Sequence, residues 1–183
     1  TLHGATAHAG ATPISMRRDA AYVAGAVIRH ARELSHEIDG QRATVGSLSL
    51  SPNLVNVVAE EARLTVDLRN PDAARLGMAE ERLRDFVIRV ASEENVRVEC
   101  EKRVDVAPVR FAGEVIAAIE DAARKLRYPA RRLISGAGHD AQIMAAVCPT
   151  GMIFIPSRGG ISHNIHEYTA PEIWRQTGGR IDA

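Results

Sequence analysis

The sequence predicts two consecutive units, an α+β unit over residues 1–108 and an α/β unit over residues 109–183. In the first unit, segments with apolar residues at alternate positions are interleaved with segments whose apolar residues recur every three or four positions. These are the periods of strands and helices. The second unit holds a short apolar run between glycine and proline, which is typical of a strand buried on both faces. The composition changes at Ala107-Pro108-Val109, where we expect a hinge.

The first half of the α+β unit predicts a strand, a helix and a second strand. Residues 1–8 form a strand pattern, which the glycine and proline that follow bring to an end. Between residues 15 and 38, apolar residues recur at intervals of three and four, so we expect an amphipathic helix. Residues 43–50 predict a strand with weak alternation, and Ser51-Pro52-Asn53 turns the chain.

The second half of the α+β unit repeats the pattern with a clearer strand. Residues 62–69 alternate strictly between apolar and polar, which predicts one buried face and one solvated face. Asn70-Pro71-Asp72 marks the start of a helix that extends to about Glu94, and residues 96–100 begin the last strand. The order strand, helix, strand, strand, helix, strand predicts a ferredoxin-like sandwich with both helices on one face of the sheet.

The C-terminal unit predicts fewer elements. Residues 115–126 have helical periodicity that ends before Pro129, and residues 152–155 form the apolar run expected to be a buried strand. This unit is too short for a complete doubly wound domain. We therefore expect it to be the last part of a larger α/β domain.

Composition restricts the function class. Lys plus Arg and Asp plus Glu each number 23, so the formal net charge is zero. Nucleic acid and anionic membranes usually require a basic excess, and a small metabolite is the expected partner. Cys100 and Cys148 lack a CxxC spacing and lie in apolar surroundings, so we expect buried free thiols and a reducing cytoplasm.

Targeting features are also informative. The sequence shows no signal peptide and no apolar run of membrane-spanning length, so neither secretion nor membrane anchoring is expected. The chain begins with Thr1 instead of methionine, in what resembles the middle of a strand. We expect the natural polypeptide to begin earlier.

Two glycine-flanked histidine loops predict an active-site rim. The loop of residues 159–167 places two imidazoles and a carboxylate after a Gly-Gly pair, and these groups are ligands for zinc and similar divalent ions. A solvated loop of no function is the alternative for such a His-x-x-His pair. Residues 135–140 add a second histidine beside a carboxylate, and the two loops bracket the predicted buried strand.

These loops belong to a set of five ordered motifs that runs from residue 1 to about residue 172. The set resembles the N-carbamoyl-L-amino-acid hydrolase, ureidopropionase and allantoate amidohydrolase group of di-metal amidohydrolases, relatives of aminoacylases and zinc carboxypeptidases. The motifs are His8-Ala9-Gly10-Ala11-Thr12-Pro13 with Arg18-Asp19-Ala20, Ser51-Pro52-Asn53 through Asn56, Val66-Asp67-Leu68-Arg69, Ser135-Gly136-Ala137-Gly138-His139-Asp140, and Ile161-Ser162-His163 with Glu167.

The resemblance implies a lid and dimerisation domain over residues 1–108 and the C-terminal part of a catalytic domain over residues 109–183. It implies two divalent ions per site, zinc, manganese, cobalt or nickel, with His163 as one ligand. Members of this group are longer, and a preceding segment supplies the other ligands and a general-base Glu. The 183-residue chain alone is therefore expected to be inactive. The intact protein is expected to be a cytoplasmic homodimer that hydrolyses N-carbamoyl amino acids, ureidopropionate or allantoate.

The resemblance also assigns roles within the lid. His8 would stabilise the oxyanion, in many relatives at the neighbouring subunit's site. Arg69 would clamp the substrate carboxylate with its guanidinium, and Asn56 would add a donor. The ordinary alternatives are an ion pair of Arg69 with Asp67 or Asp72, and turn chemistry for Asn56.

In the C-terminal unit, Gly138 and His139 would bind the substrate, with His139 bonding the scissile amide oxygen. Alternatively, His139 and Asp140 cap the helix that follows. His166 is expected to be a surface residue and Glu167 to orient the loop. Two rival functions stay open, a non-catalytic dimerisation module that retains the lid and a peptidase or deacylase of the wider superfamily.

Overall fold

A computed structural model describes residues 1–176 of the 183-residue chain. The chain divides into two compact units, Thr1–Pro108 and Val109–Ala183. The first contains all strands of the described residues, and the second contains short helices joined by extended chain.

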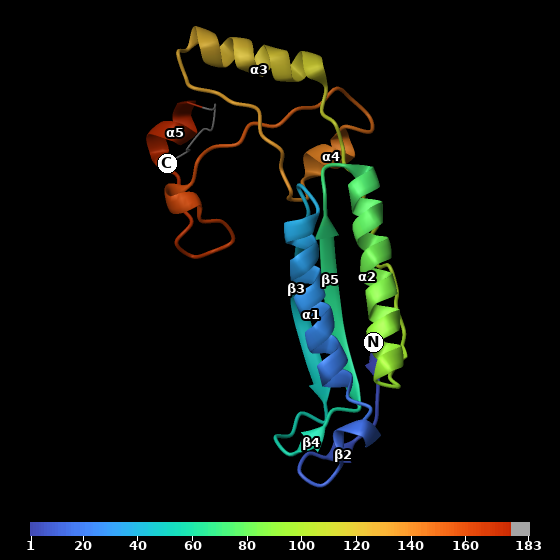
Figure 1. The fold of residues 1–183 in the computed structure, drawn as a ribbon. Helices are drawn as coiled ribbons and strands as arrows, with labels where there is room; N and C mark the ends of the chain where they lie inside the picture. The colour runs from blue at the N-terminus through green and yellow to red at the C-terminus, as the bar shows by residue number, and fades with distance from the viewer. Residues whose placement is uncertain (177–183) are drawn as a thin grey trace. The chain divides into compact units, whose positions relative to one another are not determined.

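The N-terminal unit is built on a four-stranded antiparallel sheet with the order β3-β5-β1-β6. A separate pair, β2 with β4, lies at the end of the sheet where β5 begins (Figure 1). The strands are β1 (Leu2–His3), β2 (Ala7–His8), β3 (Arg42–Ser51), β4 (Val57–Val58), β5 (Glu61–Arg69) and β6 (Arg97–Val98).

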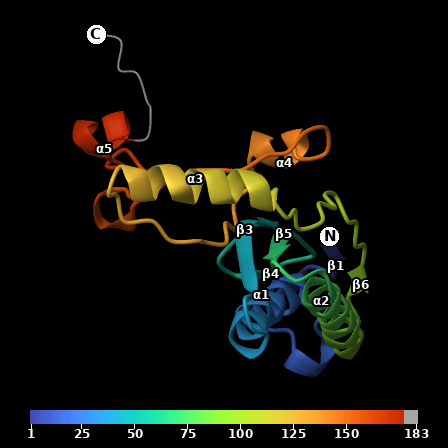
Figure 2. The same ribbon diagram turned by 90° about the horizontal axis from the view of Figure 1, so that it is seen from above.

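Two long helices, α1 (Ala20–Glu37) and α2 (Ala73–Glu93), run along the sheet. Figure 2 shows both on the same side of the strands. Along the chain, the elements of the main sheet and its two helices follow the order strand, helix, strand, strand, helix, strand. That order follows from the two hydrophobic periods of the sequence, because a helix buries a stripe of residues and a strand buries alternate residues.

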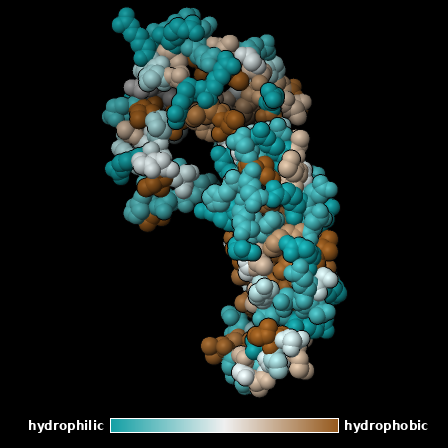
Figure 3. Space-filling view, viewed as in Figure 1, coloured by the Kyte–Doolittle hydropathy of each residue, from teal (hydrophilic) through white to brown (hydrophobic). Residues whose placement is uncertain are grey.

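The core lies between the helices and the sheet. Small side chains at the contact let the backbones approach closely, since Ala20, Ala62 and Ala79 have no exposed surface. Leu2 and Val23 pack in one cluster with Ala20 and Ala62, and Leu34 packs with Ala79 in another. Burial of each aliphatic side chain of this size contributes about 1.5–3 kcal/mol. The opposite, solvent-facing side of the helices is mainly hydrophilic (Figure 3).

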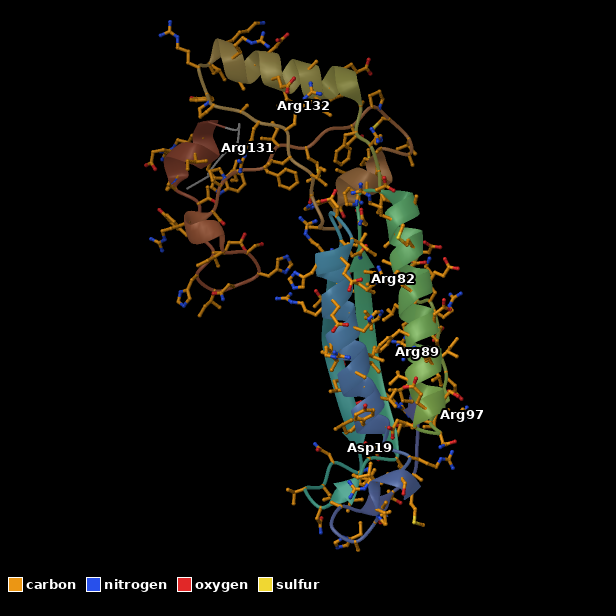
Figure 4. The ribbon with its side chains drawn as sticks, viewed as in Figure 1. Asp19, Arg82, Arg89, Arg97, Arg131 and Arg132 are labelled. Atoms are coloured by element: carbon orange, nitrogen blue, oxygen red, sulfur yellow. The ribbon has the colours of Figure 1, made fainter. Side chains whose placement is uncertain are left out.

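Aspartate caps determine where both helices begin. The carboxylate of Asp72 accepts the N–H groups of Ala74 and Arg75, as the predicted helix start requires. Helix α1 begins five residues later than residue 15, the predicted start. A short 3-10 turn, Ile14–Met16, precedes it, and Asp19 at its start caps the helix (Figure 4). Because Asp19 caps the helix, α1 begins at Ala20, although the apolar periodicity extends to earlier residues.

An ion pair joins the C-terminal end of α1 to the middle of α2. Arg82 of α2, labelled in Figure 4, donates to the carboxylate of Glu37 at the end of α1. This hydrogen bond, followed by the charge of Arg82, holds the pKa of Glu37 below its ordinary value. The pair is exposed, so it specifies helix alignment more than it stabilises the fold.

The predicted strand over residues 1–8 is in fact two short strands. Between them the chain passes close to the segment before α1, and Ala5 forms a bridge with Arg18. Gly4 permits this approach, because a Cβ atom there would lie 2.0 Å from the carbonyl oxygen of Arg18. The strand β4, which pairs with β2, was not predicted.

The C-terminal unit contains the predicted helix as α3 (Gly113–Lys125), followed by α4 (Asp140–Met144), the 3-10 turn η2 (Arg158–Gly160) and α5 (Pro171–Gln176). The predicted strand over residues 152–155 is wrong. Residues 109–176 contain no strand that could pair with this run, and a lone strand would leave its backbone groups unbonded. Ile153 and Phe154 are 54% and 45% exposed.

The expectation of buried cysteines is also wrong. Cys100 and Cys148 are free but exposed. Cys100 lies past the end of β6, and Cys148 follows α4 in a unit whose residues 109–175 include no buried side chain. Apolar neighbours in sequence therefore did not produce burial. Within residues 1–176, the helices are all too short or too polar to cross a membrane.

Replacement of Gly4 by alanine tests the close approach of β1 to the segment before α1. We expect Gly4→Ala to lower the free energy of unfolding by about 1–3 kcal/mol, because the clash is with backbone atoms that cannot rotate away. Gly77 is the matched control, since it is exposed in α2 and an added methyl group would meet no atom within 4 Å. Gly77→Ala should stabilise by about 0.5–1 kcal/mol. Urea unfolding that finds Gly4→Ala as stable as wild type would contradict the packing.

Candidate functional site

The structure brings two of the predicted lid residues together at one end of the N-terminal unit. Strands β2 and β4 pair with His8 opposite Val57, and the N–H of Ala9 donates to the carbonyl of Asn56 at 3.0 Å. His8 and Asn56 therefore lie on adjacent backbone segments. His8 is exposed.

The imidazole of His8 is held in a defined orientation. Its Nδ1 accepts the N–H of Gly10 at 3.0 Å and the N–H of Ala11 at 3.1 Å. A nitrogen that accepts hydrogen bonds carries no proton, so the neutral ring has its proton on Nε2. The backbone thus presents His8 as an Nε2–H donor.

The third predicted lid residue, Arg69, lies at the opposite end of the sheet. Strand β5 is nine residues long, so its ends are roughly 26 Å apart at about 3.3 Å per residue. Asn56 precedes the start of β5, and Arg69 is its last residue (Figure 1). The structure therefore separates Arg69 from His8 and Asn56.

Arg69 forms a two-pronged ion pair with Asp67 on the open face of the sheet. Its Nε and Nη2 donate to the two carboxylate oxygens at 2.8 and 2.7 Å, which confirms the pair with Asp67 considered from the sequence. The hydrogen bonds, then the charge of Arg69, hold the pKa of Asp67 below its ordinary value. The same interaction raises the pKa of Arg69. The guanidinium already binds a carboxylate in the geometry that a substrate carboxylate would need.

A second pair repeats this arrangement at the other end of β5. Arg63 donates to the two carboxylate oxygens of Glu61 at 2.8 and 3.3 Å. Both pairs join an arginine to a carboxylate two residues earlier. Their similarity makes Arg63 a natural control for Arg69.

In the C-terminal unit, His139 stands at the N-terminus of α4. Its N–H donates to Oε1 of Gln142 at 3.1 Å, and its Nε2 lies 3.2 Å from Oγ of Ser135. The ring contacts Phe154 edge-on, with centroids 5.5 Å apart. His139 is thus the N-cap residue of α4, whereas Asp140, the carboxylate considered as the cap, is the first residue of the helix. Gly138, the other predicted substrate-binding position, immediately precedes the cap.

His163 occupies a strained position in an exposed loop. Its φ of 56° is in the left-handed region, which costs a non-glycine residue energy and is frequent at functional sites. The carboxylate of Glu167 accepts the N–H of His163 at 2.7 Å. Glu167 therefore orients the loop, as expected, and His166 is exposed, as expected.

The described residues do not complete a metal site. Residues 1–176 contain no group of three or more His, Cys, Asp or Glu side chains that could hold an ion. A stable zinc site needs about three or four protein ligands. His163 is the candidate ligand of its loop, and the carboxylate of Glu167 in the same loop accepts the N–H of His163.

The comparisons with known proteins agree with these motifs. The family model for peptidase family M20/M25/M40 matches residues 3–177. An N-carbamoyl-L-amino-acid amidohydrolase from Paenarthrobacter aurescens is 38% identical over 92% of this chain and 41% of its own length. An allantoate amidohydrolase from Escherichia coli is 36% identical over 92% of this chain and 41% of its own length. The chain therefore spans about two fifths of these curated relatives.

A solved structure gives the same result for the fold. The hydantoinase/carbamoylase family amidase from Burkholderia vietnamiensis superimposes with a TM-score of 0.91 at 38% identity, over 96% of this chain and 43% of that one. Since the family model covers nearly the whole chain, this protein belongs to peptidase family M20/M25/M40.

Proposed function

We propose that this chain is part of a metal-dependent amidohydrolase that cleaves a linear amide or carbamoyl C–N bond. The substrate would be an N-carbamoyl amino acid, ureidopropionate or an allantoate-type compound. The observation that carries the proposal is the fixed Nε2–H donor of His8 beside Asn56. The names of the relatives, N-carbamoyl-L-amino-acid and allantoate amidohydrolases, support the same substrate class.

The two units would have different tasks. Residues 1–108 would be a ferredoxin-like lid and dimerisation domain, which the sheet order and the two covering helices support. Residues 109–183 would be the C-terminal part of the catalytic domain. Exposure supports this second assignment, because Ile143 and Val147 are 74% and 77% exposed in a unit without a buried side chain among its described residues. Further chain would cover such apolar groups.

His163 would be one ligand of a pair of divalent ions, zinc, manganese, cobalt or nickel, whose other ligands lie outside these 183 residues. Bound ions of this kind polarise a carbonyl oxygen and lower the pKa of a bound water. The described residues form no complete site, so this chain would contribute His163 to the metal centre and its other proposed residues to the substrate and the reacting carbonyl.

His8 would donate its Nε2 proton as a hydrogen bond to the oxygen of the reacting carbonyl. A donor preorganised by two backbone bonds stabilises charge that develops on that oxygen without rearrangement. Arg69 would exchange its internal partner Asp67 for the substrate carboxylate, retaining a two-pronged bond. His139, fixed at the start of α4, would bond the amide oxygen from the catalytic domain.

The separation within the lid supports a site shared between two chains. A small ureido acid cannot bridge roughly 26 Å, the length of β5. His8 and Asn56 of one chain would therefore serve a different site from Arg69 of the same chain. Strand β3 is a ten-residue edge strand of the sheet, and a long edge of this kind can pair with a second copy. In a two-fold homodimer joined through β3, the two lids would run in opposite directions. The end of one lid that carries His8 would then lie at the same end of the dimer as Arg69 of the other lid.

Exchange of Arg69 for lysine tests the carboxylate clamp in the full-length protein. We expect Arg69→Lys to raise KM for an N-carbamoyl amino acid by about tenfold or more, because an ammonium cannot form the two parallel bonds. Arg63→Lys breaks the equivalent pair with Glu61 and should leave KM within about twofold of wild type. Steady-state kinetics on both variants make the comparison. Equal effects of the two substitutions would show that Arg69 has no special role.

Mixed dimers test the shared site. One subunit carries His8→Ala and the other carries His163→Ala, and each variant alone should be nearly inactive, with His8→Ala lowering kcat by about a hundredfold or more. Random mixing should restore about a quarter of the wild-type activity, since half of the dimers are mixed and each has one complete site. Mass spectrometry or differential tags establish that mixing has occurred. Mixed dimers without restored activity would mean that His8 serves its own subunit.

A further inference from the structure

The guanidinium of Arg17 bridges the two ends of the loop that follows His8. Its Nη2 donates to the carbonyl of Ala9 at 2.5 Å, and its Nε donates to the carbonyl of Thr12 at 3.0 Å. The side chain of Arg17 is half-buried. A guanidinium is a rigid planar fork, so bonds from two of its nitrogens fix the separation and direction of both carbonyls.

The N–H groups that hold the imidazole lie between these two carbonyls. Gly10 and Ala11 donate to Nδ1 of His8, and the N–H of Thr12 donates to the carbonyl of His8 at 3.0 Å. The loop is thus a turn closed by the bond from Thr12 to His8, and the imidazole of His8 accepts two N–H groups from within it. A change in the turn that moves these two N–H groups would remove the bonds that keep Nδ1 unprotonated, so both tautomers of His8 could form.

We propose that Arg17 is a positioning residue that keeps this turn in the conformation that holds His8 as an Nε2–H donor. Arg17 acts through the turn and through His8, without touching the substrate itself. The consequence for catalysis rests on the proposed function of His8, whereas the consequence for the imidazole does not.

The neighbouring Arg18 is the matched control. Its Nε donates to the carbonyl of Asn95 at 2.8 Å, so it also bonds a backbone carbonyl from the same segment of chain. That carbonyl lies in the turn between α2 and β6, away from the loop of His8. Loss of Arg18 therefore removes a similar interaction without altering the hydrogen bonds around the imidazole.

The first test is spectroscopic. Protein labelled with ¹⁵N-histidine is examined by NMR at about pH 8, where imidazole is neutral, and the His8→Ala variant identifies the His8 signals. Wild type and Arg18→Gln should show His8 as a single tautomer protonated on Nε2. Arg17→Gln should show a mixture of the two tautomers. If Arg17→Gln does not fold, Arg17→Lys, which can hold one carbonyl but not both, should show the same mixture.

An unchanged His8 tautomer in a folded Arg17 variant overturns the proposal. This readout does not depend on turnover, so it decides the role of Arg17 even if the full-length protein hydrolyses none of the proposed substrates. Failure of that hydrolysis in the wild-type protein would instead count against the proposed function.

The second test is kinetic and uses the full-length protein. Arg17→Gln should lower kcat by about tenfold with KM within about twofold of wild type, because the lost interaction acts on the transition state. In the His8→Ala background, Arg17→Gln should have almost no further effect on kcat, since both changes remove the same donor. Independent, additive losses in the double variant would overturn the proposal, because they would mean that Arg17 does not act through His8.

Discussion

The antiparallel ladder between β3 and β5 determines the dimensions of the N-terminal unit. It extends from the pair Arg42–Arg69 at one end to the pair Ser51–Glu61 at the other, with one irregularity between Val45 and Ser47. Every other element is placed against this ladder. Both helices run along it, β1 pairs with its inner strand, and β2 with β4 follows at one end. The distance between the two groups of proposed substrate-binding residues is therefore the length of a strand.

A rigid strand of this kind is a suitable support for residues that, in the proposed function, act at two places. Side-chain positions on a strand vary less than those on a loop, because the ladder bonds fix the backbone. Arg69 stands on the strand itself, paired with Asp67. His8 stands on a two-residue strand and needs additional support, which the turn that follows provides through two N–H groups.

Local patterns in the sequence predicted the regular elements but not their contacts. The helices α1, α2 and α3 and the strands of the main sheet follow from the apolar periodicity, and the start of α2 follows from Asp72. The division of the first strand depends on the approach of Gly4 to Arg18, residues that no local pattern connects. The apolar run at residues 152–155 failed as a strand because a strand requires a neighbour, and apolar composition does not provide one. The ordered motifs identified the candidate site residues, but they did not predict which of them lie together. Asn56 and Arg69 are close in sequence, yet they lie at opposite ends of an extended segment.

In the proposed function, one substrate is bound by residues of two chains. The most direct measurement is a crystal structure of the full-length protein with a non-hydrolysable ureido acid bound. We expect the carboxylate of the ligand to contact Arg69 of one chain, and the ureido oxygen to contact Nε2 of the other chain's His8. Contacts from His8 and Arg69 of a single chain to the same ligand would contradict the claim.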